Sequence, residues 1–302
     1  MSEAAIAVVG SVAFDTIETP IGRAEEVLGG SATHFAVAAS YFAPVRLVGV
    51  VGEDFPDPER EYLASRGIDL SGLEVRPGRT FRWTGRYHED MNVRDTLSLE
   101  LNVFADFRPT LSPLVRSSPI VFLANIDPTL QDAVLEQFED PAIVACDTMN
   151  HWIAGAREPL EALLPRVDLL ILNDEEARLL SGEQNVSRAA RRILELGPRS
   201  VLVKRGEYGA ILFSADSVFA VPAYPLEEVF DPTGAGDTFA GGVIGYLAAT
   251  GERSEGGLRR AIVYGSVLAS YVVEDFGGQR LRTLTRDDID RRYRQFVELT
   301  EF

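Results

Sequence analysis

The amino-acid sequence predicts an α/β fold in which helices cover both faces of a mostly parallel sheet and a small β-sheet lid is added to it. Three observations support this prediction. Short runs rich in Val, Ile and Leu recur along the chain, one segment alternates apolar and polar residues with a period of two, and a small-residue turn precedes an apolar stretch with helical spacing.

Six short runs define the expected strands of the large sheet. Each ends in or beside Gly, Asp or Asn and precedes a helical pattern: IAVVG, RLVGVVG, IVFLAN, AIVACD, DLLILN and SVLVKRG. Such alternation is typical of a parallel sheet whose crossover helices lie on both faces. Ligands bind at the carboxyl ends of strands in these sheets, so the residues that follow are candidate site residues: Asn125, Asp147, Asn173 and Lys204.

A different pattern between residues 80 and 104 predicts an antiparallel hairpin. Apolar residues alternate with polar ones on both sides of the connection HEDMNVRD, with Phe81, Trp83 and Tyr87 before it and Leu97, Leu99, Leu101 and Val103 after it. The apolar face needs a cover, which the main core, a second copy of the hairpin or a ligand could supply. A small lid over a ligand and a plain edge hairpin fit this pattern equally well.

Composition limits the class of protein and its partners. With 302 residues and 46% hydrophobic content, the chain can bury a large core, and it lacks an apolar run long enough to span a membrane. Its start shows neither the basic region nor the cleavage pattern of a signal peptide, so we expect a cytoplasmic protein. The single cysteine, Cys146, lies in an apolar run and is expected to be a packed thiol.

The net charge also bears on ligands. Acidic residues outnumber basic ones 46 to 29, giving a formal charge of −17, which disfavours nucleic acid and anionic membrane as partners. A phosphate-bearing ligand would therefore need a locally positive pocket. Backbone amides and helix N-termini can provide one without adding net charge.

The strongest chemical signal is DPTGAGDTFAGGVIGYLAA, residues 231–249. If a helix begins inside GAGD, free N–H groups and the positive end of the helix dipole face a phosphate that gains charge during transfer. Asp237 lies in the same turn. A lone Asp at this position is usually a helix cap, but beside a phosphate-binding turn it can also take a proton from an attacking hydroxyl.

Two other nucleotide motifs fit less well. GAGDTFA superficially matches a dinucleotide fingerprint, but YPLEEVFDPT before it is a poor buried strand, and a carboxylate after the second glycine would repel a pyrophosphate. The chain has neither a GxxxxGK[ST] loop nor the protein-kinase signatures. These observations disfavour a dinucleotide-dependent oxidoreductase, a P-loop enzyme and a protein kinase.

DPTGAGDTFAGG resembles the C-terminal signature of the ribokinase-like, phosphofructokinase-B type carbohydrate kinases, and LGGSATHFAVAAS, residues 28–40, resembles their N-terminal glycine-pair signature. The resemblance covers nearly the whole chain. It implies a single Rossmann-like kinase domain over residues 1–302, with a lid formed by roughly residues 12–28 and 80–104. It also implies ATP with Mg²⁺, and transfer of the γ-phosphate to a hydroxyl of a sugar or nucleoside.

The resemblance assigns roles at the phosphate end. Asp237 matches the catalytic base, and the amides of Gly234, Ala235 and Gly236 match the anion hole. Asp231 and Thr233 match positions that help to bind a monovalent cation, so K⁺ is a further expected ligand. Asn173 and Glu176 in NDEEA match an N-x-x-E motif that organises hydrated Mg²⁺ and phosphates, whereas their residue types alone indicate only a helix start. VLVKRGEYGAILF resembles the strand–turn–strand beside the nucleotide, which adds Lys204, Gly206 and Gly209; a plain hairpin turn with a solvated lysine is the alternative.

At the acceptor end, Asp15 matches a carboxylate that binds substrate hydroxyls, and Gly29 and Gly30 match the pair that lets backbone approach the substrate. His34 stands where many members have Asn, and it is either a substrate contact or a satisfied histidine at a helix start. Further acceptor-binding candidates are Phe81, Trp83 and Asn125. The D-x-N-x-R pattern of many sugar kinases is present only as DTMNHW, without its arginine, and ASYVVEDFGGQRL departs from the usual adenine-pocket ending.

The aromatic face of the hairpin could stack a nucleobase or a sugar, or could be the lid's own packing. We expect a sugar or sugar-like polyol as acceptor, with a purine nucleoside as the alternative and a non-catalytic nucleotide-binding regulator as a distant one. A homodimer through the lid is a further expectation.

Overall fold

A computed structural model describes residues 4–301 of the chain. Within these residues one sheet has nine strands in the order β13-β12-β11-β10-β9-β8-β1-β4-β5. The strands from β11 to β5 are parallel, and β12 and β13 extend one edge in antiparallel pairing. The strand bounds are β1 (Ile6–Val9), β4 (Val45–Gly52), β5 (Ile68–Arg76), β8 (Ile120–Leu123), β9 (Ile143–Asp147), β10 (Leu169–Asn173), β11 (Ser200–Lys204), β12 (Ala210–Ser214) and β13 (Val218–Val221).

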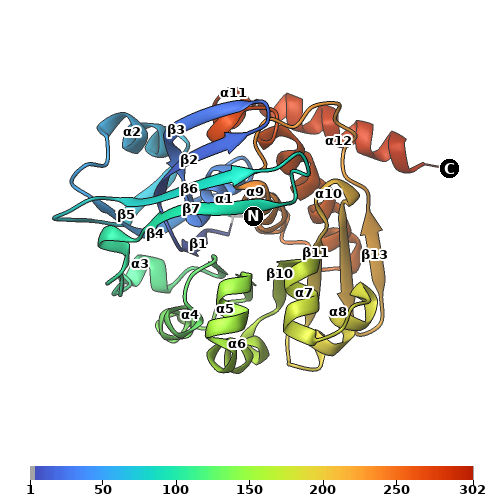
Figure 1. The fold of residues 1–302 in the computed structure, drawn as a ribbon. Helices are drawn as coiled ribbons and strands as arrows, with labels where there is room; N and C mark the ends of the chain where they lie inside the picture. Colours follow the sequence, from blue (N-terminus) through green and yellow to red (C-terminus); the bar gives the residue numbers. More distant parts are fainter. Residues whose placement is uncertain (1–3, 302) are drawn as a thin grey trace.

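A second, small sheet is separate from the first and has the order β3-β2-β6-β7. Its strands are β2 (Ala13–Thr19), β3 (Gly22–Gly29), β6 (Phe81–Tyr87) and β7 (Arg94–Glu100). Two antiparallel hairpins, β2–β3 and β6–β7, join through parallel pairing of β2 with β6. In Figure 1 this sheet lies on the opposite side of the molecule from α4 to α8.

The helices lie on both faces of the large sheet. Their bounds are α1 (Ser31–Ala39), α2 (Asp57–Ser65), α3 (Pro113–Arg116), α4 (Pro128–Leu135), α5 (Asn150–Gly155), α6 (Arg157–Leu163), α7 (Asp174–Ser181), α8 (Val186–Leu194), α9 (Ala235–Thr250), α10 (Glu255–Val272), α11 (Gln279–Thr283) and α12 (Arg286–Thr300), with 3₁₀ turns η1 (Asn102–Phe104), η2 (Leu164–Arg166), η3 (Gly206–Tyr208) and η4 (Phe276–Gly278). Among the helices of residues 4–301, none is long and apolar enough to cross a membrane.

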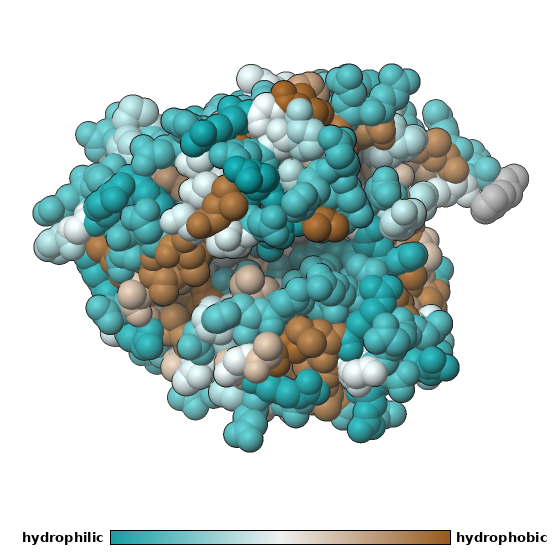
Figure 2. Space-filling view, in the orientation of Figure 1, coloured by the Kyte–Doolittle hydropathy of each residue, from teal (hydrophilic) through white to brown (hydrophobic). Residues whose placement is uncertain are grey.

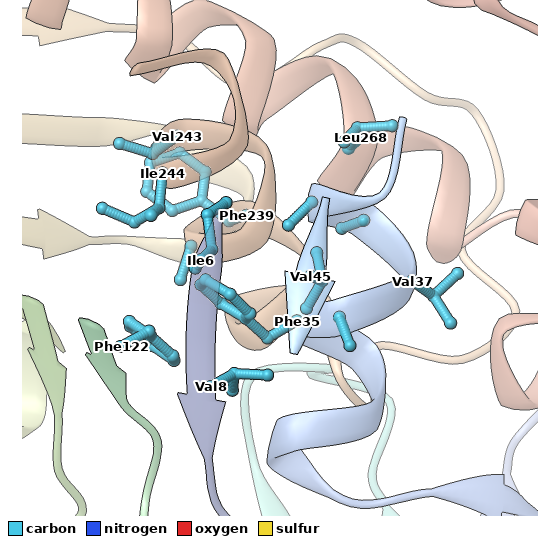
Figure 3. Packing of buried hydrophobic residues seen from close by; sticks show 14 of the residues in the cluster. Ile6, Val8, Phe35, Val37, Val45, Phe122, Phe239, Val243, Ile244 and Leu268 are labelled. Atoms are coloured by element: carbon cyan, nitrogen blue, oxygen red, sulfur yellow. The ribbon is translucent and has the colours of Figure 1, made fainter. Parts of the chain in front are cut away.

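Alternate residues of the buried strands contribute to two hydrophobic cores. Ile6 and Val8 of β1 belong to the core beneath α1, α9 and α10, whereas Ala7 and Val9 belong to the core beneath α4 to α8. Figure 3 shows the first core, where the Phe35 ring of α1 stacks on Phe122 of β8 with 4.0 Å between ring centroids. Burial of both faces explains why the strand runs are apolar without alternation.

The predicted fold class is confirmed, with two local differences. No helix follows β1, because the chain enters β2 and β3 of the small sheet directly, and β11 turns back into β12 instead of entering a helix. The second turn contains Gly206 and Gly209 with φ values of 54° and 84°. A backbone with positive φ favours glycine, so the residues RGEYG specify a tight turn between the two strands.

Helix α9, which begins within GAGD, packs closely against the backbones of two neighbouring helices, α1 and α10. A Cβ added to Gly242 of α9 would lie 2.8 Å from the Cα of Gly265 in α10, and one added to Gly241 would lie 2.4 Å from the carbonyl oxygen of Phe35 in α1. Glycine therefore allows α9 to contact both neighbouring helices closely. This packing fixes the position of the first turn of α9.

Candidate active site

Polar residues gather where the parallel strands end. Asp147 is the last residue of β9, Asn173 the last of β10 and Lys204 the last of β11, and Asn173 pairs directly with Lys204 in the sheet register. Figure 2 shows a hydrophilic hollow across the middle of one face, between the region of the small sheet and the region of α5 to α7. The predicted strand-end residues are therefore close together.

The start of α9 provides a set of free N–H groups. Gly234 precedes the helix with a φ of 73°, and no described side chain caps the helix start. The N–H of Ala235 donates to the carbonyl of Pro232 (3.2 Å), whereas those of Gly234 and Gly236 have no partner in the described residues. Free amides at the positive end of a 16-residue helix form an anion-binding site.

Asp237 lies in the first turn of this helix without acting as its cap. Burial is the main cause that raises the pKa of its carboxyl group to about 8, and the charge of Asp147 adds to the effect. Lys204 and Arg94 act in the opposite direction. The carboxylate of Asp237 is buried, does not cap the helix and has a raised pKa. These properties suit a proton acceptor better than a helix cap.

Asp15 is buried in β2 and lies against the glycine pair. A Cβ on Gly29 would be only 2.0 Å from Asp15 Oδ2, and Gly30 has a φ of 94°. Burial first, and then the charge of Asp231, raise the pKa of Asp15 to about 7, although the Gly30 N–H lowers it. Asp15 also raises the pKa of Asp237, so the two carboxyl groups are within electrostatic range of each other.

His34 is buried between two glycines of the site. A Cβ on Gly234 would lie 2.4 Å from the His34 ring, and one on Gly278 would lie 3.7 Å from it. Burial lowers the pKa of His34 to about 4, so the imidazole is neutral, and its Nε2 has no partner in the described residues. The histidine supports the turn before α9, and its free nitrogen is available for a hydrogen bond.

The other predicted acceptor contacts have partners inside the protein. Asn125 Oδ1 accepts a hydrogen bond from Trp152 Nε1 (3.0 Å), and the Phe81 ring stacks on Phe104 with 5.6 Å between centroids. Trp83 Nε1 donates to Thr96 Oγ1 (3.2 Å). Phe81 thus packs on η1, the turn that follows the hairpin.

Asn173 and Glu176 form the start of α7. Asn173 Oδ1 accepts from the Glu176 N–H (2.8 Å), and Glu176 Oε2 accepts from the Asn173 N–H (2.7 Å), which is a capping box. Burial raises the pKa of Glu176 to about 7, opposed by the ammonium of Lys204. The helix-start interpretation of these residues is therefore correct, and Glu176 keeps its second carboxylate oxygen for other contacts.

Lys204 is not a solvated lysine. Its Nζ donates to Asp147 Oδ2 at 3.1 Å, and the side chain is 18% exposed. The turn that follows contacts the hairpin, since a Cβ on Gly206 would lie 2.1 Å from Asn92 Oδ1, and Gly209 is packed against the Val221 carbonyl. The tip of the β6–β7 hairpin therefore reaches the turn that follows β11.

The loop before α9 is held by buried hydrogen bonds. Asp231 Oδ1 accepts from the Thr233 N–H (2.8 Å), and Asp231 Oδ2 accepts from the Gly277 N–H (2.9 Å). The Thr233 hydroxyl donates to the Tyr87 hydroxyl of β6 (3.2 Å). Asp231 joins two loops, and Tyr87 connects the small sheet to them.

Two residues at this site were not assigned by sequence. Tyr87 contacts Thr233, and Arg94 of β7 lowers the pKa of both Asp15 and Asp237. Their only signal in the sequence was their place in the predicted hairpin. Asp147 was predicted as a strand-end candidate, but its ion pair with Lys204 was not predicted.

The donor set fits Mg²⁺ bound mainly by phosphates and water. No group of three or more His, Cys, Asp or Glu residues within residues 4–301 forms a ready-made metal site. Glu176 has one carboxylate oxygen that takes no part in its capping box, and the carboxylate of Asp237 makes no capping hydrogen bond. Both carboxylates therefore have oxygens free for a metal-bound water. Mg²⁺ often retains several waters beside one or two carboxylates and substrate phosphates.

Known proteins resemble this chain in sequence. A model of the pfkB family of carbohydrate kinases matches residues 3–284. The cytidine kinase of Thermococcus kodakarensis is 32% identical over 245 residues, which cover 79% of this chain and 87% of that protein.

Solved structures share the fold. The nucleoside kinase of Methanocaldococcus jannaschii, an archaeal member of the ribokinase family, aligns with a TM-score of 0.78 and 20% identity over 97% of this chain and 99% of its own. An E. coli protein assigned as ribokinase II and solved with ATP and Mg²⁺ aligns with a TM-score of 0.74 and 22% identity, over 99% of this chain and 100% of its own.

Proposed function

Because the chain belongs to the pfkB family of carbohydrate kinases and is a phosphotransferase of that family, we propose that it transfers the γ-phosphate of ATP to a hydroxyl group on the ribose of a nucleoside. The observation that carries this proposal is the position of Asp237. This carboxyl group is buried beside the free N–H groups of α9 and makes no capping hydrogen bond to them. It is also within electrostatic range of Asp15 and Lys204.

In the proposed reaction, the ionised carboxylate of Asp237 takes the proton of the acceptor hydroxyl as its oxygen bonds to the γ-phosphorus. The bond from phosphorus to the β–γ bridging oxygen breaks, and that oxygen leaves with ADP. The N–H groups of Gly234 and Gly236 hold the phosphoryl oxygens that gain charge, and Ala235 joins them if its N–H leaves the Pro232 carbonyl.

At the nucleotide end, Lys204 supplies a buried positive charge, and Gly206 and Gly209 let the turn after β11 approach the nucleotide. Asn173 and Glu176 present a helix start on the neighbouring strand, where Glu176 would hold a water of the Mg²⁺ shell. Bound Mg²⁺ would neutralise phosphate charge. The net charge of −17 makes such local positive groups necessary.

At the acceptor end, Asp15 can accept hydrogen bonds from two neighbouring hydroxyls, as the diol of ribose offers. Gly29 and Gly30 let the backbone come close, and His34 Nε2 is available as a further contact. A nucleoside is favoured because a cytidine kinase and a nucleoside kinase are among the similar proteins. A free sugar has the same diol and is the second candidate, because the matching family is one of carbohydrate kinases.

A coupled assay of ADP release tests the proposal. The panel should contain cytidine, uridine, adenosine, inosine and guanosine, with ribose, deoxyribose, fructose, 2-dehydro-3-deoxygluconate and inositols. A nucleoside with the highest kcat/KM supports the proposal, and a free sugar with the highest value replaces it by the second candidate. Nucleotide binding without turnover on any compound would indicate a non-catalytic regulator.

Three further expectations belong to this proposal. Exposed Leu97 and Leu99 on β7, with Leu101 directly after it, support a homodimer through the small sheet, which sedimentation of the protein would test. The loops joined by Asp231 support a monovalent cation site, which activity in K⁺ compared with choline would test. A cytoplasmic location is tested by cell fractionation.

A further inference from the structure

Lys204 is the only lysine in the chain, which has 28 arginines. We propose that Lys204 is a catalytic residue whose ammonium group contacts the phosphoryl group in transfer, and that Asp147 is a positioning residue that holds this ammonium group beside the first turn of α9. This inference rests on the proposed kinase activity and names two parts of its phosphate site.

The position of the ammonium group is the first argument. A Cβ added to Gly236 would lie 2.8 Å from Lys204 Nζ, so the ammonium group contacts the backbone of the anion-binding turn. The Gly236 N–H is one of the free amides of that turn. A phosphoryl oxygen bound by the turn would therefore lie beside the ammonium group as well.

The second argument is the unused hydrogen-bonding capacity of Lys204. An ammonium group has three N–H donors, and Asp147 Oδ2 is the acceptor that the described residues offer it. The side chain is only 18% exposed, so water does not fully replace the missing acceptors. A purely structural ion pair would leave these donors unsatisfied at a cost, whereas phosphate oxygens would satisfy them.

Asp147 is held firmly enough to position its partner. Its carboxylate is 5% exposed, and Oδ1 accepts from the Thr148 N–H at 2.9 Å. Its carbonyl accepts from the buried amide of Gln131 (3.0 Å), which also donates to the Ala124 carbonyl at 2.8 Å. Asp147 is thus anchored at the ends of β8 and β9, and Lys204 reaches it from β11, on the far side of β10.

The choice of lysine is the third argument. Every other basic residue that permanently carries a charge is arginine, so composition alone predicts arginine at position 204. Lysine presents a compact point charge, whereas arginine presents a planar fork that needs more space. The ammonium group already lies close to the Gly236 backbone, so a wider guanidinium fork would meet the anion-binding turn in a different geometry.

Kinetics provide one test. We expect Lys204→Met to lower kcat by a factor of about 10²–10³ with little change in the acceptor KM, as for loss of one preorganised donor to a transition state. Lys204→Arg should not restore kcat, and Asp147→Asn should lower it less than Lys204→Met. The control is Arg199→Met, which breaks the Arg199–Asp168 ion pair (3.1 Å). These two residues directly precede β11 and β10, at the ends of the strands away from the site, so kcat should be unchanged.

The single lysine permits a second test that needs neither a variant nor an identified acceptor. Protein labelled with ¹³C at the lysine ε-carbon gives one lysine side-chain NMR signal, which should move more with Mg²⁺ and a non-hydrolysable ATP analogue than with Mg²⁺ and ADP. Equal signal positions in both complexes would overturn the proposed contact, as would normal turnover of folded Lys204→Met. Failure of the proposed function would instead appear as a wild-type protein without turnover, which leaves the NMR comparison intact.

Discussion

The phosphate end of the site and the small sheet differ in how completely the rest of the chain holds them. At the phosphate end, Asp231, Glu176 and Asp147 are buried and hydrogen-bonded, and α9 contacts its neighbours through glycines. In the small sheet, every residue of β7 is exposed, and Leu99 is 56% exposed. The comparison indicates that the groups proposed for phosphate transfer are fixed by many internal contacts, while the sheet proposed for the acceptor side leaves one strand exposed.

The largest expected effect falls on the phosphate end. Asp237→Asn keeps the size of the side chain but removes the proton acceptor, so turnover should fall by a factor of about 10²–10⁴. Steady-state kinetics on the identified acceptor would measure it, with calorimetry to verify that Mg²⁺–ATP still binds. Asp127→Asn is the matched control, because Asp127 caps α4 through the Thr129 N–H and lies at another helix start. Normal turnover of folded Asp237→Asn would make Asp237 a structural residue.

Asp15→Ala tests the border between the two regions. It removes a charged hydrogen-bonding group at the acceptor end, which should cost about 1.5–3 kcal/mol, or roughly a 10- to 150-fold rise in the acceptor KM. The KM for ATP should change little, because Asp15 lies beside the glycine pair and away from the phosphates. Glu18→Ala, on the same strand, serves as the control. An unchanged acceptor KM in Asp15→Ala would remove Asp15 from the site.

Tyr87→Phe tests the connection between the two regions. It removes the hydroxyl that accepts from Thr233 Oγ1, and loss of this hydrogen bond should lower acceptor kcat/KM by about two- to tenfold. Hydrogen exchange gives a second measurement: acceptor with a non-hydrolysable ATP analogue should protect residues 80–103 in wild type, and less in Tyr87→Phe. Tyr224→Phe, which removes a tyrosine hydroxyl that donates to Gln295 Oε1 of α12 (3.0 Å), should behave as wild type. If the ligands leave wild-type exchange unaltered, the lid role of the hairpin is wrong.

The smallest expected effect is a pH dependence of stability. Burial is the main cause that raises the pKa of Asp15 to about 7 and of Asp237 to about 8, against an ordinary value of 3.8 for Asp. Between pH 3.8 and about 8 these two groups bind more protons in the folded state than in the unfolded state. Their contribution to stability is therefore fully present below pH 3.8 and is lost as the pH rises towards 8. The ligand-free protein should therefore melt at a lower temperature near pH 8 than near pH 6, and the difference should be smaller in Asp237→Asn. A melting temperature that rises over this interval would contradict the assignment.

Much of the phosphate end was predictable from the sequence because its signals are local. The strand runs specify their own burial, and GAGD specifies both a turn and a helix start within a few residues. The capping box of Asn173 and Glu176 is also local, which is why the helix-start interpretation was sound.

The remaining features depend on residues that are distant in sequence. Tyr87 and Thr233 are 146 positions apart, and Lys204 and Asp147 are 57 positions apart with β10 between their strands. Phe81 packs on Phe104 because the chain folds back through η1 after β7, which an alternating pattern does not reveal. The acceptor, expected from the sequence to be a sugar, stays a prediction, because the motifs quoted for it are shared by kinases for sugars and for nucleosides.

The glycine contacts of α9 have a consequence for mutational tolerance. Any side chain at Gly241, Gly242 or Gly265 would place an atom less than 3 Å from neighbouring heavy atoms, so these positions should accept almost no replacement. The exposed positions of β7 carry no comparable restriction. Under random mutagenesis with selection for a new acceptor, surviving substitutions should therefore accumulate in the small sheet, while the helix that presents Asp237 stays unchanged.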